Sequence, residues 1–269
     1  MKILSCAMGI PLLRFGRIDS TMKKARDLIR ESPGDAFIVM ADEQTEGRGR
    51  IEGRTWAGSF GESLLMTLCL KGDFSQSEAP PLKIGLAVHA VLSELAPARI
   101  RIKWPNDIMG QRLQGQAPGT SSSFRKLGGL LCENSGGWLL AGIGLNLGPH
   151  AYSPALHSGA TSLAEVAGTL HAEEEIKFAD AETLASATGE AALDWLKTDS
   201  WREEYQKAMW AIGEDVRFIV GHPDHGLTRQ GRMLGIDGSG RLLLEDERGG
   251  VEAFWSGEIS SIVAACQRR

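Results

Sequence analysis

The residues best suited to chemistry gather in one short stretch, 44–56, which begins with Gln44 and ends with Trp56. Between them, three glycines each precede an arginine: Gly47-Arg48, Gly49-Arg50 and Gly53-Arg54. Glycine lets the backbone come close to a ligand, although ordering it carries an entropic cost. Arginine presents planar, permanently charged donors that match carboxylate and phosphate groups. The stretch therefore predicts a loop that folds over an anionic ligand.

A solvated basic loop, or a Gly-Arg segment that binds nucleic acid, would have a similar composition. Gly-Arg tracts of that kind are long and repetitive, whereas this stretch is short and lies between apolar runs at 36–41 and 63–70. The net charge of −5 and the pI near 5.7 also argue against a general nucleic-acid binder, because such proteins usually need a basic domain.

A second polar group follows a strand-like segment at 99–104, in which apolar and basic residues alternate. Pro105 removes a backbone donor and ends this strand, so Lys103, Asn106 and Asp107 meet at its end. These side chains could form a site. A turn after a strand would also favour Pro-Asn-Asp for purely local reasons, and the sequence leaves both interpretations open.

Other polar residues stand where the expected elements begin or end. Ser20 and Thr21 precede a helix-forming segment, where a hydroxyl can cap the first turn or hold a polar ligand atom. Lys126 begins one strand-like run and Asn146 lies near the end of the next. Four glycines within these runs indicate close approach of another backbone or a ligand: Gly128, Gly129, Gly142 and Gly144. Dinucleotide and phosphate-loop motifs are absent from the sequence.

The composition is that of a packed globular protein, with 42% hydrophobic and 23% charged residues in 269. The four cysteines are widely spaced and lack a Cys-x-x-Cys pair, which argues against a zinc site and favours a reducing compartment. No apolar stretch approaches the roughly 18 residues of a membrane span, and 1–13 lacks a clear cleavage site. We expect a cytoplasmic protein without a membrane partner.

The periodicity predicts an α/β protein with a small β-rich region at its C-terminal end. Helices are expected at 23–31, 83–95, 161–168 and 176–209, and strands at 36–41, 63–70, 99–104, 127–133 and 138–147. The polar segment 110–123 is expected to be a flexible loop. Short β-like runs follow at 216–220, 231–236, 241–244 and 251–255, which is typical of a small barrel.

Taken in order, these motifs resemble those of the biotin–protein ligases (biotin–[acetyl-CoA-carboxylase] ligases). The resemblance is carried by residues 18–21, Gln44, 47–50, 53–54, Trp56, 103–107, 126–133, 142–146 and 237–240. It implies a catalytic domain, 1–212, with a mixed sheet and flanking helices, and an SH3-like C-terminal domain, 213–269. It also implies activation of biotin by ATP to biotinyl-5′-AMP and transfer to a lysine of a biotin carboxyl carrier protein.

The resemblance also implies roles for single residues. The catalytic residues would be Arg50, Lys103, Asp107 and Asn146. Biotin would be bound by Ser20, Thr21, Gln44, Gly47, Arg48, Gly49, Arg50, Lys126 and Gly129. ATP would be bound by Arg50, Arg54, Trp56, Lys103, Asn106 and Asn146. Magnesium would be held by the ATP phosphates, with Asn146 as its one candidate protein contact and no other side-chain ligand. The chain would be a monomer or a homodimer.

Some features depart from the family pattern. Two residues, Ile51 and Glu52, separate the second and third Gly-Arg pairs, where the family commonly has one. Met22 replaces a frequent asparagine, and the loop at 110–123 is longer than usual. There is no room before Ile18 for a helix-turn-helix domain, so we expect an enzyme and not a DNA-binding regulator.

Three alternative functions compete with this one, and the last two belong to other functional classes. A lipoate–protein ligase would share the broader fold and chemistry, but the Gly-Arg-Gly-Arg loop favours biotin. A non-catalytic biotin-binding homologue would not need the set Arg50, Lys103 and Asn146, which is intact here. A nucleic-acid-binding module is disfavoured by the acidic pI.

Overall fold

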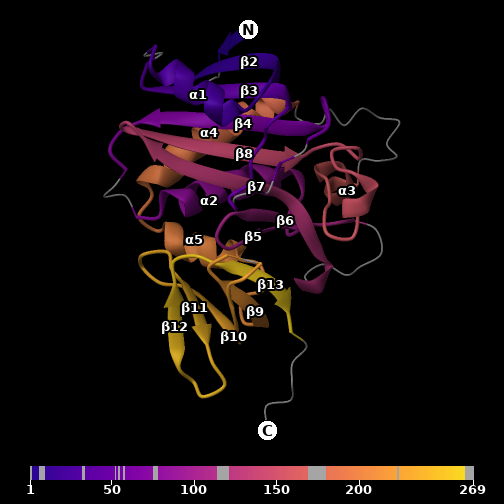
Figure 1. Cartoon of the computed structure of the whole chain (residues 1–269), viewed down its shortest axis with the longest axis vertical. Coiled ribbons are helices and arrows are strands. Elements are labelled where there is room, and N and C mark those ends of the chain that lie inside the picture. Colours follow the sequence, from indigo (N-terminus) through magenta and orange to yellow (C-terminus); the bar gives the residue numbers. More distant parts are fainter. Residues whose placement is uncertain are drawn as a thin grey trace.

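The computed structural model describes residues 2–5, 10–31, 34–51, 53, 55–56, 58–74, 78–113, 121–168, 180–222 and 224–263. The described residues form two sheets with helices around the larger one (Figure 1). Arg54 lies outside them, so its predicted contact with ATP remains a prediction. No helix within the described ranges is long and apolar enough to cross a membrane.

The larger sheet has eight strands in the order β1-β2-β3-β4-β8-β7-β6-β5. β2 and β3 are parallel and the other neighbours are antiparallel, so the sheet is mixed, as predicted. The strands are β1 Lys2–Ser5, β2 Pro11–Ile18, β3 Ala36–Gln44, β4 Ser63–Lys71, β5 Ile100–Lys103, β6 Asp107–Gln111, β7 Phe124–Ser135 and β8 Trp138–Asn146. The segment 45–62, which includes the Gly-Arg pairs, therefore joins two adjacent strands, β3 and β4.

Helices cover both faces of this sheet because successive side chains of each strand point to opposite sides. On β3, Phe37 and Val39 pack with α1 (Thr21–Ile29), whereas Ile38 and Met40 join the larger core on the other side. That larger core is covered by α2 (Pro80–Leu95) and α4 (Ala181–Lys197), which also pack against each other. Each fully buried aliphatic side chain contributes on the order of 2 kcal/mol.

The smaller sheet has the order β12-β11-β10-β9-β13, with all neighbours antiparallel. Its strands are β9 Asp215–Val220, β10 Leu227–Ile236, β11 Leu242–Glu245, β12 Val251–Phe254 and β13 Glu258–Ile262. Asp237 makes the turn between β10 and β11, where its Oδ1 accepts hydrogen bonds from the Ser239 and Arg241 amides at 2.9 Å. The C-terminal β region is thus confirmed. Its strands β12 and β13 remain sheet edges, and the boundary at 212/213 remains a prediction.

The smaller sheet is fixed to the larger one next to the polar group at 103–107. Trp104 is 2% exposed and donates its indole N–H to the Gly240 carbonyl at 3.0 Å. Its ring packs against Phe218 of β9, with 6.1 Å between ring centroids. The helix α5 (Trp201–Ala208) lies between the two sheets in Figure 1 and contacts both β5 and β10.

Some predicted boundaries are wrong. Residues 107–111 form β6, where a turn and a loop were expected, because Ile108 and Met109 are buried between β5 and β7. The single helical region 176–209 is two helices, α4 and α5, separated at 198–200. The short helix expected at 161–168 is confirmed as α3 (Leu163–Ala167), which begins with a capping box between Ser162 and Glu165. In the part of the chain that the structure describes, the remaining short elements are two 3₁₀ turns, η1 (Ser121–Ser123) and η2 (Pro154–Leu156).

His89 on α2 makes the free energy of unfolding depend on pH. Burial lowers the pKa of His89 to about 4, with a smaller contribution from the charge of Arg101. The unfolded chain therefore takes up this proton first as the pH falls, and about 3 kcal/mol of stability present above pH 6.5 is lost between 6.5 and 4. We expect His89→Gln to remove this part of the acid sensitivity. Urea denaturation of both proteins at pH 7.5 and pH 4.5 measures it, and equal losses in the two proteins would contradict it.

Candidate active site

Two adjoining cavities lie at one end of the large sheet. The first, of about 70 Å³, is lined by α1, β3, β4, β7, β8 and the 45–62 segment. The second, of about 110 Å³, is lined by the 103–107 turn, the same segment and the C-terminal sheet. Five residues line both cavities: Gly49, Arg50, Trp56, Asn106 and Lys126. The two polar groups predicted from the sequence therefore belong to one site.

One end of the first cavity has fixed hydrogen-bonding groups. Gln44 Oε1 accepts hydrogen bonds from the Thr21 amide at 2.7 Å and from Thr21 Oγ1 at 3.1 Å. Thr67 supports this pair by donating to Thr21 Oγ1 at 2.9 Å. These bonds orient the Gln44 amide so that its NH₂ is left for a ligand. Ser20 is the N-cap residue of α1, but its side chain makes no capping bond.

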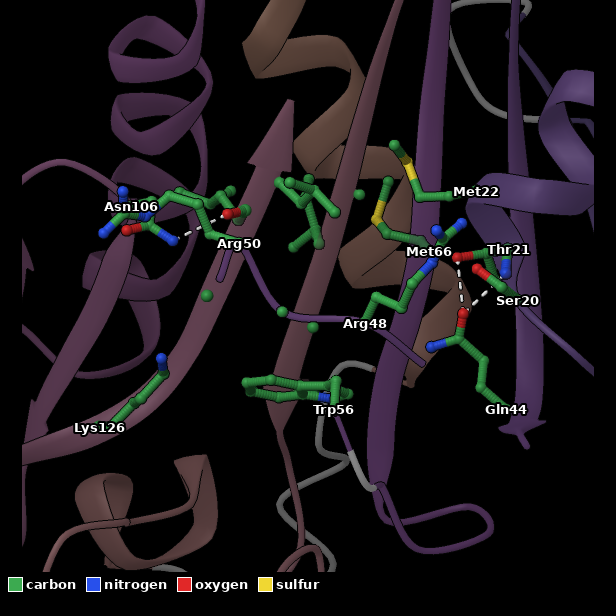
Figure 2. Close-up of a pocket in the computed structure, with 17 residues that line it drawn as sticks. Ser20, Thr21, Met22, Gln44, Arg48, Arg50, Trp56, Met66, Asn106 and Lys126 are labelled. Atoms are coloured by element: carbon green, nitrogen blue, oxygen red, sulfur yellow. Dashed lines mark hydrogen bonds between the residues drawn. The ribbon is translucent and has the colours of Figure 1, made fainter. Parts of the chain in front are cut away.

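The opposite end is cationic. Figure 2 shows Thr21 and Gln44 on one side of the cavity and Asn106 and Lys126 on the other, with Trp56 between them. The Asn106 amide donates to the Leu130 carbonyl at 3.0 Å, so it is held against β7.

The floor of the cavity depends on two glycines of β8. A Cβ atom on Gly144 would lie 2.6 Å from Trp56 Cε2, and one on Gly142 would lie 3.0 Å from Met22 Sδ. Another group does approach each of these two glycines closely, but it is a side chain and not the backbone or ligand that the sequence predicted. The indole N–H of Trp56 is buried without a hydrogen-bond partner. It is therefore a donor that a ligand can satisfy.

We expect Gly144→Ala to displace the Trp56 ring, because contacts near 2.6 Å are far inside van der Waals distance. Affinity for ligands of both cavities should fall about tenfold, since Trp56 lines both. Isothermal titration and tryptophan fluorescence of the variant would measure this. Gly16→Ala, at an exposed position of β2 where an added Cβ atom would meet nothing within 4 Å, is the control for the mutation itself. Unchanged affinity in Gly144→Ala would contradict the expectation.

Backbone hydrogen bonds join the two ends of the glycine–arginine segment, residues 47 and 56. Trp56 donates its amide to the Gly47 carbonyl at 2.9 Å, and Arg48 pairs with Thr55 in a β-bridge. A Cβ atom on Gly47 would lie 2.4 Å from the Trp56 carbonyl oxygen, so this closure requires glycine there. Arg48 lines the first cavity only. Arg50 lines both, and its Nη2 donates to the Gly257 carbonyl of the C-terminal sheet at 2.9 Å.

Asp107 lies between two lysines. Lys126 Nζ donates to Asp107 Oδ1 at 2.7 Å, and Lys103 Nζ lies 3.7 Å from Asp107 Oδ2. Each ammonium also faces an indole ring: Lys103 is 6.0 Å from the Trp210 centroid and Lys126 is 5.9 Å from the Trp56 centroid. One carboxylate thus orients two cations beside the junction of the cavities. Together with Arg48 and Arg50 they form a set of preorganised donors for a negatively charged ligand.

Asn146 lies apart from this set. Its side chain is buried, donates its amide to the Thr161 carbonyl at 3.0 Å, and lines neither cavity. The other described residues predicted for the site line one cavity or both, except Gly47, which closes the segment. Gly129 lines the first cavity, where the β7 backbone forms its wall.

Sequence reasoning missed several residues that shape the site. Met66, Leu131 and Ile143 give the first cavity apolar walls, but in the sequence they are ordinary members of apolar strands. Trp210 faces Lys103, and Gly257 and Glu258 line the second cavity. No local motif marks these three, because more than 100 residues separate them from the lysine that they accompany.

Comparison with known proteins agrees with this geometry. The sequence model of the Biotin/lipoate A/B protein ligase family matches residues 15–149. The chain is 30% identical over 266 residues to the bifunctional ligase/repressor BirA of Bacillus subtilis, which covers 94% of this chain and 74% of BirA. It is 31% identical over 258 residues to the biotin–[acetyl-CoA-carboxylase] ligase of Paracoccus denitrificans, covering 90% of this chain and 99% of that protein.

A solved structure shares the fold over nearly the whole chain. The biotin protein ligase from Aquifex aeolicus in complex with biotin and ATP superposes with a TM-score of 0.73 at 26% identity. The superposition covers 93% of this chain and 97% of the Aquifex chain. With these similarities, the chain belongs to the biotin/lipoate A/B protein ligase family.

Proposed function

We propose that this chain is a biotin–protein ligase, which activates biotin with ATP and transfers the biotinyl group to a lysine of a carrier protein. The observation that carries the proposal is the junction of the two cavities, where Arg50, Trp56 and Lys126 line both. A site that joins two substrates through an acyl-phosphate bond needs two compartments that meet at cationic groups. The relatives named for biotin, rather than lipoate, support the choice of acid.

In this proposal biotin occupies the first cavity. Its ureido group would bond with the Gln44 amide and with Ser20 and Thr21, while its apolar body packs on Met22, Met66 and Ile143. Its carboxylate would point toward Arg48 and Lys126. The Thr21–Gln44–Thr67 hydrogen bonds support this orientation, because they fix the recognising groups before the ligand arrives.

ATP occupies the second cavity. A carboxylate oxygen of biotin attacks the α-phosphorus, the bond to the bridging oxygen breaks, and pyrophosphate leaves with the electron pair. Arg50 and Lys103 offset the negative charge that gathers on the phosphates, and Trp56 packs on the adenine. Asp107 keeps Lys103 and Lys126 oriented, which the distances of 3.7 Å and 2.7 Å from its carboxylate oxygens support.

Magnesium in this reaction would neutralise part of the triphosphate charge. Within the described ranges no three His, Cys, Asp or Glu side chains lie close enough to bind a metal ion. Asp107 is already paired with two lysines. These observations favour an ion that is held by the phosphates themselves. A contact from Asn146 would require its side chain to leave Thr161.

In the second step the carrier lysine attacks the acyl carbon of biotinyl-5′-AMP, and AMP leaves with the bonding electrons. The chain must exclude water until that lysine arrives, because the mixed anhydride is hydrolysed readily. The closed 47–56 segment, with Arg50 bonded to Gly257, is suited to this task. The proposal includes a cytoplasmic location, a monomer or homodimer, and no nucleic-acid partner.

Biotin-dependent exchange of labelled pyrophosphate into ATP tests the proposal. The purified chain is incubated with MgATP and either biotin or lipoate, without any carrier protein. Exchange with biotin alone is expected. Exchange with lipoate alone would make the chain a lipoate–protein ligase, and exchange with neither acid, despite measurable biotin binding, would make it a non-catalytic binder.

A further inference from the structure

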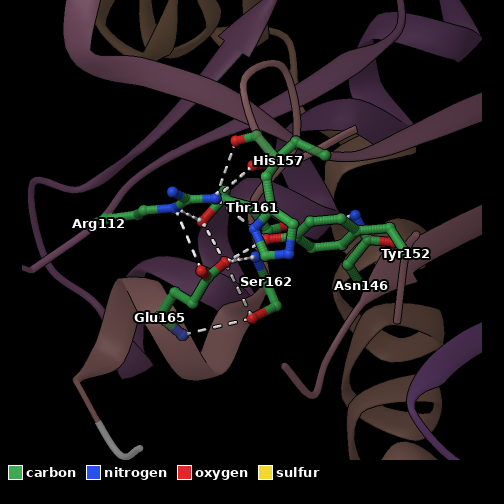
Figure 3. Close-up of polar contacts among 8 residues, drawn as sticks. Arg112, Asn146, Tyr152, His157, Thr161, Ser162 and Glu165 are labelled. Carbon is green, nitrogen blue, oxygen red and sulfur yellow. Dashed lines mark hydrogen bonds and ion pairs between the residues drawn. The ribbon is translucent and has the colours of Figure 1, made fainter. Parts of the chain in front are cut away.

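Arg112 is the residue after β6, and its guanidinium contacts several residues within 152–165 (Figure 3). Its Nη2 donates to the carbonyls of His157 at 3.2 Å and Ala160 at 2.8 Å, and to the Tyr152 hydroxyl at 3.1 Å. Its Nε donates to Thr161 Oγ1 at 3.4 Å. A planar guanidinium presents five N–H donors in a fixed arrangement, whereas a lysine ammonium has three donors on a flexible stem. None of these contacts involves the cavities described above.

Glu165, on α3, contacts Arg112 and Tyr152, and these three residues with Thr161 form one hydrogen-bonded network. One of its carboxylate oxygens lies 3.3 Å from Arg112 Nε. The other accepts hydrogen bonds from the Tyr152 hydroxyl at 2.5 Å and the Ser162 amide at 2.9 Å. Burial, together with this carboxylate, raises the pKa of Tyr152 to about 12. At neutral pH the group therefore consists of a cation, a carboxylate and a neutral phenol, and its charges are matched.

Backbone hydrogen bonds of Lys126 connect this network to the active site. The Lys126 amide donates to the Gly159 carbonyl, and its carbonyl accepts from the Thr161 amide, both at 2.9 Å. Ala160 thus forms a parallel β-bridge with Lys126 on one side, while its carbonyl accepts from Arg112.

Lys126 depends on this bridge because its sheet is incomplete there. The pairing of β8 with β7 begins at Gly128, beyond Lys126, and the β6–β7 register shifts between Ile108 and Met109. Residues 159–161 therefore take the place that β8 would otherwise occupy beside Lys126. The ammonium of this residue lies at the junction of the two cavities.

We infer that Arg112 is a positioning residue: it fixes residues 157–161, which fix the backbone of Lys126 and so the place of its ammonium in the site. The inference rests on the proposed function for its effect on the reaction. Its structural part, the support of Lys126 through Ala160, stands on the hydrogen bonds alone.

The kinetic test compares Arg112→Ala with the wild-type chain in biotin-dependent pyrophosphate exchange. We expect kcat to fall about tenfold, since a displacement near 1 Å at reacting groups has effects of this order or larger. The KM for ATP should change less than threefold, because the contacts assigned to ATP are intact, whereas the KM for biotin should rise with the displacement of Lys126. Arg112→Lys keeps the charge but not the planar arrangement of N–H donors, and it should recover only part of kcat. If Arg112→Ala does not fold, Arg112→Lys must itself show the fall in kcat at an unchanged KM for ATP.

The structural test is amide hydrogen exchange of peptides that cover 124–128 and 157–162, which should be faster in Arg112→Ala. Arg229→Ala is the control, because Arg229 makes an exposed pair with Glu252 on the smaller sheet, lines neither cavity and should change neither measurement. A wild-type chain without any biotin-dependent exchange would overturn the proposed function and the kinetic part together. An active wild type with an unchanged kcat in Arg112→Ala overturns the inference alone, and unchanged amide exchange overturns its structural part.

Discussion

Lys103→Gln is expected to slow biotin-dependent pyrophosphate exchange by about 10²- to 10³-fold, a loss of about 3–4 kcal/mol of transition-state stabilisation. The Lys103 side chain is only 15% exposed, and its Nζ lies 3.7 Å from Asp107 Oδ2 and 6.0 Å from the Trp210 ring centroid. A carboxylate and an indole thus restrict the ammonium before any phosphate arrives. Glutamine has a similar length but no charge, so it removes the electrostatic contribution with little change of packing.

The rate of exchange at saturating biotin and ATP measures this effect, and biotin affinity should change little because Lys103 lines only the second cavity. Lys71→Gln is a matched control: Lys71 also ends a strand and lies 3.5 Å from a carboxylate, that of Asp35, but is exposed and far along the sheet from the cavities. A loss in Lys103→Gln no larger than that in Lys71→Gln would remove Lys103 from the phosphate site.

The sequence was most informative where chemistry and local structure coincide. The 44–56 stretch was expected between two strands of one sheet, and β3 and β4 are indeed adjacent on either side of it. Ser162 and Glu165 carry a complete capping signal within four residues, and the structure has the capping box. Such features depend on residues near one another in the chain, so a local pattern contains the information.

Tertiary contacts between distant residues were not predictable in the same way. The alternation at 99–104 identified β5, but nothing at 107–111 shows that Ile108 and Met109 would be buried between β5 and β7. Asn146 illustrates the limit for sites. Its motif suggested a ligand contact, whereas its amide donates to Thr161 and so ties β8 to the segment beside Lys126. Its part in catalysis remains a prediction.

The contribution of the C-terminal sheet to the site was not predictable from the sequence either, because that contribution is a backbone carbonyl. Any residue at position 257 would provide a carbonyl oxygen, so the acceptor for Arg50 has no side-chain signature. The glycine itself is required for another reason: a Cβ atom there would lie 2.2 Å from Phe218 Cζ. The turn that presents the carbonyl is thereby pressed against the core of the smaller sheet, which gives Arg50 a rigid partner.

Because of this contact, we expect Arg50→Ala to impair retention of the intermediate much more than adenylation. Adenylation should persist within about tenfold of the wild-type rate, because Lys103 still offsets the phosphate charge. Biotinyl-5′-AMP should escape at least about tenfold faster, because the 47–56 segment loses its bond to Gly257 and the cation that spans both cavities. Rapid filtration after a single turnover, with pyrophosphatase present, measures the free and the protein-bound intermediate.

Arg48→Ala distinguishes this effect from the loss of any arginine in the segment. Arg48 lines only the first cavity, and the described contacts show it paired with Thr55 through the backbone, not with the C-terminal sheet. Its replacement should weaken biotin binding and leave the intermediate on the protein. If Arg50→Ala retains biotinyl-5′-AMP as long as the wild type does, the contact with Gly257 does not help to close the site. Equal escape from both variants would mean that the segment closes through its total charge, without a specific role for Arg50.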